Sequence, residues 1–175
     1  MRDRDGQVDP ATMRASLEQH LGSRQVSRVV YGAIIGLALI VALDSHPPEP
    51  GVMAIWLLGT AVAVGLAEVY SDIVGTETNT RRRVTRHDVG HIVEDAVAVG
   101  YGVAFPAVFF VIAALGLLEV GTAFSIAKWT GLGLIGFYGY WAARFAGATT
   151  RGALVKGLIV ALIGAGLIAL KSLVH

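Results

Sequence analysis

The chain has 175 residues, of which 54% are hydrophobic and only 15% are charged. A soluble domain of this length needs a polar surface that this composition does not supply, so we expect a polytopic membrane protein in contact with the lipid bilayer. Cysteine is absent, which excludes disulfides, thiolate metal ligands and a cysteine nucleophile. The net charge of +1 gives no reason to expect a nucleic-acid partner.

Residues 1–27 are charged and lack the apolar core of a secretory signal peptide. We expect them to form a cytoplasmic N-terminal segment with one short helix, because Asp9 is a suitable N-cap and Pro10 suits the first helical position. Three apolar residues share one face of this helix: Met13, Leu17 and Leu21. That face is typical of an amphipathic helix on the inner leaflet, and a frayed polar tail is the alternative.

Five apolar segments follow, and most are close to the roughly 20 residues that a helix needs to cross the hydrocarbon of a bilayer. They run from Val29 to Leu43, Val52 to Val74, Ala96 to Leu118, Ala123 to Phe145 and Ala153 to Val174. The predicted fold class is therefore all-α, with residues 28–175 forming a five-helix transmembrane domain. The first segment is short, so we expect it to extend through Arg28 with that side chain snorkelling to the interface. Pro106 should kink the third helix because it removes a backbone donor.

The distribution of positive charge predicts the orientation. With the N-terminus inside, only Lys128 and Lys171 of the 14 lysines and arginines fall in the outer half. This positive-inside bias predicts a cytoplasmic N-terminus, an outer C-terminus and a multi-pass protein of the cell (inner) membrane. We expect Lys128 to snorkel toward the outer headgroups. Glycine is frequent, and the GxxxG pair Gly32 and Gly36 predicts close helix packing, which includes a possible homodimer.

Glu68 is the most informative residue of the chain, because it lies inside the second apolar segment. A carboxylate in lipid costs about 2.5–3.5 kcal/mol on insertion scales and by default marks a functional site. The second helix runs from outside to inside, so Glu68 lies near its inner end with its side chain tilted toward the membrane centre. It therefore needs a partner, a proton or a water-filled cavity.

A second polar group opens the third helix, where His87, Asp88, His91, Glu94 and Asp95 follow one another at helical spacing. The second and third helices are sequential and should pack as a hairpin. We therefore expect five side chains to converge at the cytoplasmic mouth as metal ligands: Glu68, Asp72, His91, Glu94 and Asp95. Carboxylate and imidazole ligands suit iron, manganese or zinc.

Simpler interpretations remain open for each of these residues. Asp88 and Glu94 are also explained by the preference for acidic residues in the first turn of a helix. Asp72 is also explained as an interfacial residue, and Glu68 as a protonated group in a buried hydrogen bond.

Parts of the sequence resemble the vacuolar iron transporter family. Residues 67–71 (Ala-Glu-Val-Tyr-Ser) are similar to that family's Gly-Glu-Tyr-Val-Ser motif, and residues 102–106 (Gly-Val-Ala-Phe-Pro) are similar to its glycine-to-proline pattern. The resemblance implies five transmembrane helices, a homodimer and a metal-contacting role for Glu68. Tyr31 stands where the family has an aspartate, and the family's membrane methionine has no counterpart, since Met53 is near the outer end of its span.

Two functions follow as hypotheses. The first is a membrane transporter of divalent metal ions, of the iron or manganese class, in which metal export is coupled to proton entry because the ligands also bind protons. The alternative is a membrane scaffold or assembly subunit with a similar fold, which the replacement by Tyr31 favours. An enzyme is not expected, because no nucleophile–base pair or phosphate-binding loop is visible. No resident cofactor is firmly implied, and the divalent metal ion is the expected substrate.

Overall fold

The computed structural model describes residues 24–174, and the regular structure of this range is entirely helical. The helices are α2 (Arg24–Leu43), α3 (Pro50–Thr80), α4 (Arg86–Ala104), α5 (Ala107–Ala114), α6 (Val120–Phe145) and α7 (Thr150–Val174). The short helix expected around Asp9 and Pro10 lies outside the described residues. The all-α fold class is confirmed for the described range.

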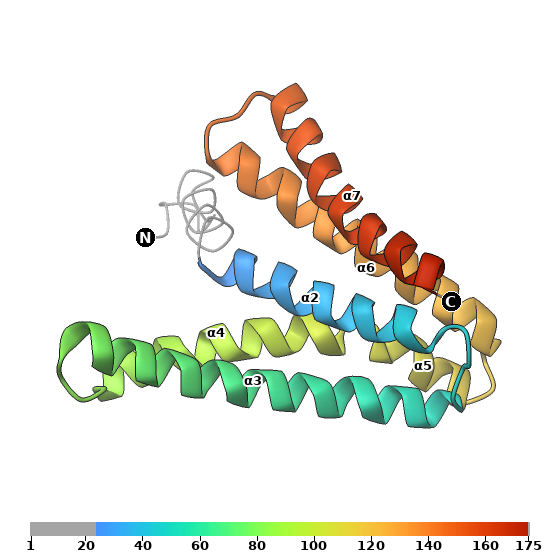
Figure 1. Cartoon of the computed structure of the whole chain (residues 1–175), viewed down its shortest axis with the longest axis horizontal. Coiled ribbons are helices and arrows are strands. Elements are labelled where there is room, and N and C mark those ends of the chain that lie inside the picture. Colours follow the sequence, from blue (N-terminus) through green and yellow to red (C-terminus); the bar gives the residue numbers. More distant parts are fainter. Residues whose placement is uncertain (1–23, 175) are drawn as a thin grey trace, which may run out of the picture.

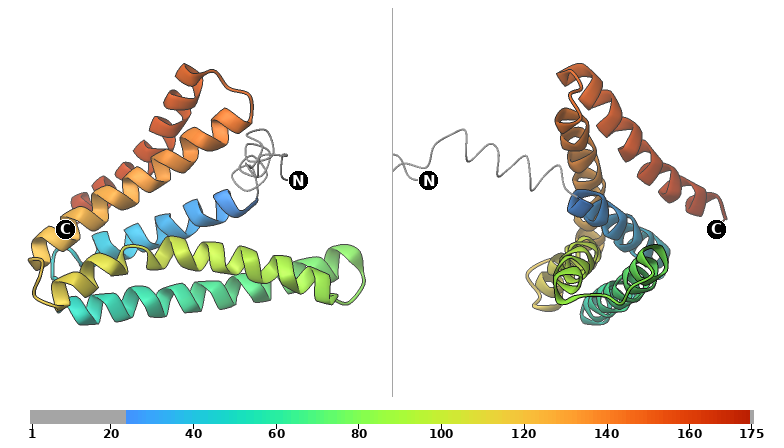
Figure 2. Two further views of the ribbon diagram at one scale, coloured as in Figure 1. Left: turned by 180° about the vertical axis from the view of Figure 1, so that it is seen from behind. Right: turned by 90° about the vertical axis from the view of Figure 1, so that its left-hand side faces the viewer.

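The helices form two antiparallel pairs with α2 between them (Figure 1). On one side of α2, α3 and α4 pack against each other, and on the other side α6 packs against α7. The end-on view in Figure 2 shows the α6–α7 pair inclined to the α3–α4 pair. The start of α2, the α3–α4 loop and the α6–α7 loop lie at one end of the molecule, which is called the loop end below. The alternating direction of the helices is the one that short connections predict.

The α3–α4 hairpin is longer than the sequence suggested. Helix α3 has 31 residues and continues to Thr80, beyond the apolar segment that ended at Val74. It stops at Arg81, whose backbone is left-handed at φ 52°. Helix α4 already begins at Arg86, so five residues connect the two helices. The polar first turns of α4 therefore lie beside the polar last turns of α3.

Pro106 breaks the third apolar segment, as predicted. Helices α4 and α5 meet there at a bend of 46°. Helix α5 ends at Ala114, and the N–H groups of Gly116 and Leu117 that follow it donate to the carbonyls of Ala113 and Ile112. This is the Schellman arrangement, which needs a residue at positive φ, and Gly116 has φ 75°.

The two buried clusters lie where α2 meets its neighbours. One cluster is centred on Phe110 and Phe124, whose ring centroids are 4.8 Å apart, and it includes Met53, Leu57 and Ile40. The smaller cluster joins α2 to α6 through Ala33, Leu37 and Ile135. Both clusters fix α2 against the other helices and thereby fix the side chains at its loop end.

Helices α2 and α4 touch backbone to backbone at Gly32 and Gly102. A Cβ atom added to Gly32 would lie 2.0 Å from the carbonyl oxygen of Val99, and one added to Gly102 would lie 2.3 Å from that of Val29. Gly36 is close to the backbone of Val103 in the same contact. The close packing predicted from the GxxxG pair is thus found inside one chain, and this glycine face is already covered by α4.

Two helices of the described range are long and apolar enough to cross a membrane, Val26–Leu43 and Pro50–Thr80. The bent α4–α5 pair adds a third if it is one span. Large apolar side chains on α3 are exposed, with Ile55 67%, Val62 63% and Leu66 65% accessible. Exposed apolar faces of this kind on long apolar helices are typical of lipid-facing surfaces.

Candidate functional site

Arg28 lies among three carboxylates at the loop end of the bundle. Its Nη1 forms an ion pair with Oε1 of Glu68. Its Nη2 lies 3.3 Å from Oδ1 and 3.4 Å from Oδ2 of Asp72, and its Nε lies 3.8 Å from Oδ2 of Asp95. Each nitrogen of the guanidinium therefore faces a different carboxylate. The four side chains, called the Arg28 cluster below, come from three helices.

Helix register explains why these side chains meet. Glu68 and Asp72 are four residues apart on α3 and share a face. Arg28 precedes Gly32 by one turn of α2, and Asp95 precedes Val99 by one turn of α4. Since Gly32 lies against the backbone of Val99 and Gly36 against that of Val103, Arg28 and Asp95 are the facing pair one turn earlier. The glycine contact therefore sets the position of the arginine.

The Arg28 cluster is mostly removed from solvent. The side chains of Glu68 and Asp95 are 11% and 10% exposed, and those of Asp72 and Arg28 are 21% and 23% exposed. Charged groups with this little exposure require a partner of opposite charge. Arg28 provides one positive charge for three carboxylates, so the formal charge of these four side chains is −2.

A polar cavity of about 420 Å³ adjoins the cluster between α3 and α4. Asp72 and Asp95 belong both to the cluster and to the cavity wall. The remaining lining comes from the last turns of α3 and the first turns of α4: Gly75, Thr76, Asn79, Thr80, Asp88, His91 and Ile92. The cavity is partly open to its surroundings and therefore gives water or an ion a route to two of the three carboxylates.

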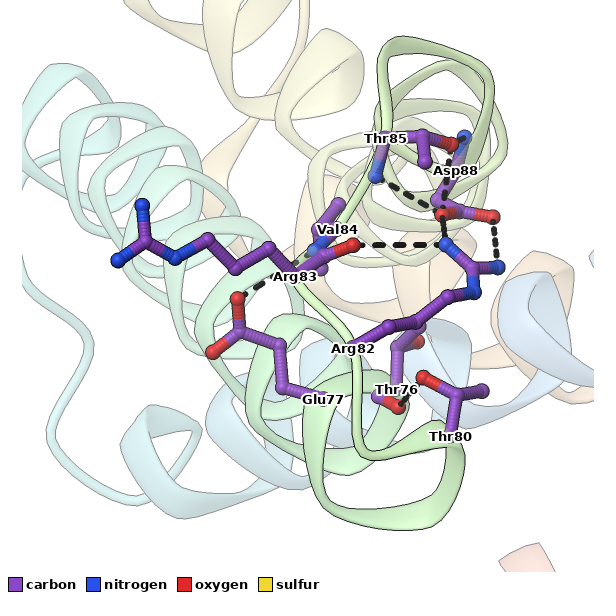
Figure 3. A network of polar contacts seen from close by, with 8 residues as sticks. All are labelled: Thr76, Glu77, Thr80, Arg82, Arg83, Val84, Thr85 and Asp88. Carbon is purple, nitrogen blue, oxygen red and sulfur yellow. Dashed lines mark hydrogen bonds and ion pairs between the residues drawn. The ribbon is translucent and has the colours of Figure 1, made fainter.

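The connection beside this cavity is held by a polar network that Figure 3 shows from close by. Arg82 Nη1 lies 2.7 Å from Oδ2 of Asp88. The N–H of Thr85 donates to Asp88, and the N–H of Asp88 donates to the Thr85 hydroxyl, which together form a capping box (Figure 3). The N–H of Val84 donates to Glu77. The hydrogen bonds from Arg82 and Thr85 hold the pKa of Asp88 well below its ordinary value, so this carboxylate is charged at neutral pH.

The structure brings together three of the five predicted ligands. Glu68, Asp72 and Asp95 meet around Arg28, and His91 lines the adjoining cavity. Glu94 lies instead in a shallow apolar groove with Val29 and Tyr101 on another face. The side chains of His91 and Glu94 are 66% and 60% exposed and lie 3.6 Å apart.

No group of three or more His, Asp or Glu side chains within residues 24–174 is arranged to hold a metal ion. The three carboxylates of the cluster instead face the guanidinium of Arg28.

The role of Arg28 was missed in the sequence. Snorkelling to the interface was the wrong expectation, since Arg28 points to Glu68, Asp72 and Asp95. Its position one turn before Gly32 was the available signal, because a residue four positions from a helix-contact glycine lies on the same face. Lys128 also has a protein partner, with its Nζ 2.6 Å from Oδ2 of Asp44 in the α2–α3 loop. This pair lies far from the Arg28 cluster, so Lys128 does not neutralise Glu68.

No family model, curated protein or solved structure matches this chain.

Proposed function

We propose that this chain is an integral membrane protein that transports a divalent metal ion of the iron or manganese class. The observation that carries the proposal is the convergence of Glu68, Asp72 and Asp95 beside a polar cavity. Carboxylate oxygens bind such ions, and ionisable side chains kept at membrane depth are costly unless they serve a pathway. The same oxygens bind protons, so exchange of metal for protons is the coupling that we infer.

The length of α3 supports a position for the cavity at the inner side of the membrane. Its 31 residues are about 46 Å long at 1.5 Å per residue, against a hydrocarbon thickness of about 30 Å. If α3 enters near Pro50, its last ten or so residues project beyond the hydrocarbon on the inner side. The cavity residues from Gly75 to Thr80 then lie in the cytoplasmic aqueous layer, and Glu68 lies just inside the apolar boundary. Ions would reach the carboxylates from the cytoplasm.

The proposed topology has five spans, with the N-terminus inside and the C-terminus outside, in the cell (inner) membrane. It is supported by the alternating helices and by the basic residues of the α3–α4 connection. Because the chain has no cysteine, single cysteines can report it directly. In sealed cells, an impermeant maleimide should label Ser45→Cys before lysis and Arg83→Cys only after lysis. The opposite labelling pattern would show that the protein has the reverse orientation.

The resemblance to vacuolar iron transporters supports the same proposal and adds a homodimer. Since α4 already covers Gly32 and Gly36, a dimer has to use another face of the bundle. Light scattering of the purified protein with its detergent mass subtracted gives the protein mass, and a mass of one chain would remove the dimer from the proposal.

The flux experiment compares wild type with Glu68→Gln in proteoliposomes that contain a metal-sensitive dye. We expect Mn²⁺ entry with wild type and background entry with Glu68→Gln. Glu77→Gln is the matched control, because it makes the same chemical change on α3 at a residue that contacts Val84 in the connection and not the Arg28 cluster. Equal flux in all three proteins would exclude Glu68 from the mechanism.

A membrane scaffold is the second candidate, and the pairing of Glu68 with Arg28 favours it. The quadruple variant Arg28→Met, Glu68→Leu, Asp72→Leu, Asp95→Leu separates the two, because it leaves no carboxylate of the cluster without its arginine. Replacing a buried ion pair by apolar side chains of similar size is often neutral or stabilising by about 1–4 kcal/mol. For a scaffold we expect a folded protein with unchanged assembly, and for the proposed transporter we expect a folded protein without Mn²⁺ flux.

A further inference from the structure

Helices α6 and α7 form an apolar groove that the proposed function does not use. The two helices touch at Gly136 and Gly157, where a Cβ atom added to Gly157 would lie 2.9 Å from the carbonyl oxygen of Gly136. The groove adjoins this contact and has a volume of about 410 Å³. Its lining is largely apolar and includes Trp129, Gly133, Phe137, Leu154, Leu158 and Ala161. Phe137 and Leu158 are 56% and 60% exposed, so the groove opens at the surface of the bundle.

Two arginines continue the rows of side chains that line this groove. Arg144 follows Tyr140 of the lining by four residues on α6, and Arg151 precedes Leu154 of the lining by three residues on α7. Residues at these spacings share a helix face. Both arginines are exposed, and they flank the α6–α7 connection at the loop end (Figure 1). The groove therefore has cations at its loop end.

Arg144 and Arg151 lie in a part of the chain that has no acidic residues. Residues 120–174 contain neither aspartate nor glutamate. Three other lysines and arginines pair with carboxylates, whereas no ion pair within residues 24–174 includes Arg144 or Arg151. Arg144 Nη1 donates to the carbonyl oxygen of Ala148 at 2.9 Å, which leaves most of the five guanidinium N–H groups for another acceptor. This end of the groove therefore suits an anion.

We propose that the α6–α7 groove binds an anionic phospholipid, with an acyl chain along the groove and the phosphate on Arg144 and Arg151. Arginine is well suited to phosphate because its N–H groups bind two oxygens at once. From Gly133 to Arg144, α6 rises by about 16 Å, which is about half of the hydrocarbon thickness of about 30 Å. The groove thus has the length of an acyl chain in one leaflet.

Aromatic side chains mark the change from the apolar to the charged part of the groove. Tyr140 lines the groove one turn before Arg144, and Trp141 stacks on Phe145 with ring centroids 5.6 Å apart. Tyrosine and tryptophan concentrate at the level of the lipid headgroups. The inference goes beyond metal transport and rests only on the proposed placement of α6 and α7 in the membrane.

The test follows the binding of single lipids to the purified full-length chain by native mass spectrometry from detergent. The probes are phosphatidylglycerol, which is anionic, and phosphatidylcholine with the same acyl chains, which has no net charge. Wild type should bind phosphatidylglycerol more tightly. Each basic side chain near an anionic headgroup changes affinity by about fivefold. The double variant Arg144→Gln, Arg151→Gln should therefore raise the Kd of the first phosphatidylglycerol by about 25-fold and change that of phosphatidylcholine much less.

The double variant Arg83→Gln, Lys156→Gln is the matched control, because it removes the same net charge outside the groove. Arg83 lies in the α3–α4 connection, and Lys156 lies two residues after Leu154 and thus on another face of α7. The Kd for phosphatidylglycerol should stay within about twofold of wild type. An equal rise in both double variants would overturn the proposal in favour of general attraction by net charge.

Gly133→Leu tests the apolar part of the groove without a change of charge. A Cβ atom at Gly133 has no other atom within 4 Å, so the larger side chain is accommodated and fills the groove. It should raise the Kd for phosphatidylglycerol severalfold. Gly59→Leu is the control, because Gly59 on α3 also has open space around it and does not line the groove. If the arginine variant does not fold, this pair decides: unchanged binding in Gly133→Leu refutes the groove.

Glycerol phosphate separates a lipid site from a site for free phosphate. It carries the phosphate of phosphatidylglycerol without acyl chains, so wild type should not bind it at concentrations that saturate the lipid. Binding of glycerol phosphate as tight as that of the lipid would overturn the lipid site.

The outcomes distinguish this inference from the proposed function. Impermeant maleimide should label Glu119→Cys and Ala146→Cys, at the two ends of α6, from opposite sides of the membrane. If it does and wild type binds both lipids equally, the lipid site alone is overturned, and the metal-flux experiment is unaffected. Labelling of both positions from one side would remove α6 from the membrane, and the lipid site together with the proposed five spans.

Discussion

The contact between α2 and α4 predicts a large difference between two chemically identical substitutions. Gly32→Ala adds a Cβ atom at 2.0 Å from the carbonyl oxygen of Val99, whereas ordinary contact begins at 3.4 Å. Gly59→Ala adds the same atom to α3 with nothing within 4 Å. Both glycines are inside helices, so the change in helix propensity is the same and the packing differs.

The expected loss of stability in Gly32→Ala follows from the lack of space between α2 and α4. The atom at 2.0 Å belongs to the backbone, so no side chain can rotate away and the two helices must separate by about 1.4 Å. Overpacking costs about 1–3 kcal/mol, and a clash with backbone lies in the upper part of that range, above the gain of about 1 kcal/mol from replacing a helical glycine by alanine. Gly59→Ala should realise only the gain. The separation also moves Arg28 away from Asp95, because the two facing pairs are one turn apart.

Thermal unfolding in the same detergent, followed by circular dichroism, measures this difference. We expect Gly32→Ala to unfold at a lower temperature than wild type, and Gly59→Ala at the same or a higher temperature. If Gly32→Ala is as stable as Gly59→Ala, then α2 and α4 do not touch at this point. The register that places Arg28 opposite Asp95 would then be wrong as well.

Three further predictions concern the two ends of the bundle. The pKa of Asp88 is lowered in the folded chain, so its stabilising effect is complete above about pH 5 and declines as the pH falls further. The difference in melting temperature between wild type and Asp88→Asn should therefore be larger at about pH 7 than at about pH 3, and a constant difference would contradict this. The side chains of Lys128 and Asp44 are partly exposed, at 26% and 38%. A double-mutant cycle with Lys128→Gln and Asp44→Asn should therefore give a coupling free energy of about 0.2–1 kcal/mol. A value above about 2 kcal/mol would show a more buried pair. Gly116→Ala should destabilise the end of α5 by about 1–2 kcal/mol, because Gly116 has φ 75° with open space around it. Gly121→Ala is the control and should not destabilise the protein, because an added Cβ there also has no atom within 4 Å and Gly121 has no positive φ. Equal melting temperatures of the two variants would contradict the positive φ of Gly116.

Periodicity and composition predicted the helices, because long apolar runs and breaking residues act locally. Pro106 lacks a backbone donor wherever it lies, and the bend between α4 and α5 follows from that alone. The convergence of Glu68, Asp72 and Asp95 was also predictable, since consecutive helices joined by a short connection pack as a hairpin. What remained inaccessible was the rotation of each helix about its own axis.

Helix rotation decided the details of the site. His91 and Glu94 remain neighbours at 3.6 Å, but His91 lines the cavity whereas Glu94 lines the groove of Val29. Arg28 was expected to snorkel because the first apolar segment is short, and the length of a segment does not depend on where a side chain points. Only the backbone contact of Gly32 with Val99 fixes the facing residues, and a GxxxG pair is equally compatible with contacts inside a chain and between chains.

The charge of the Arg28 cluster leads to one more prediction, for Asp72. One carboxylate beside Arg28 makes one attraction, a second adds an attraction and a repulsion, and a third adds one attraction and two repulsions. Each carboxylate also loses hydration when it is buried. Three acids around one arginine therefore exceed what a structural ion pair needs, and removing one charge should not lower stability.

We expect Asp72→Asn to unfold at the wild-type temperature or above it, and to bind Mn²⁺ more weakly than wild type by about tenfold or more, as expected for the loss of a charged ligand. A fall in melting temperature with unchanged Mn²⁺ binding would mean that Asp72 serves the structure, because sites that carry function are the ones whose removal leaves stability intact or improves it.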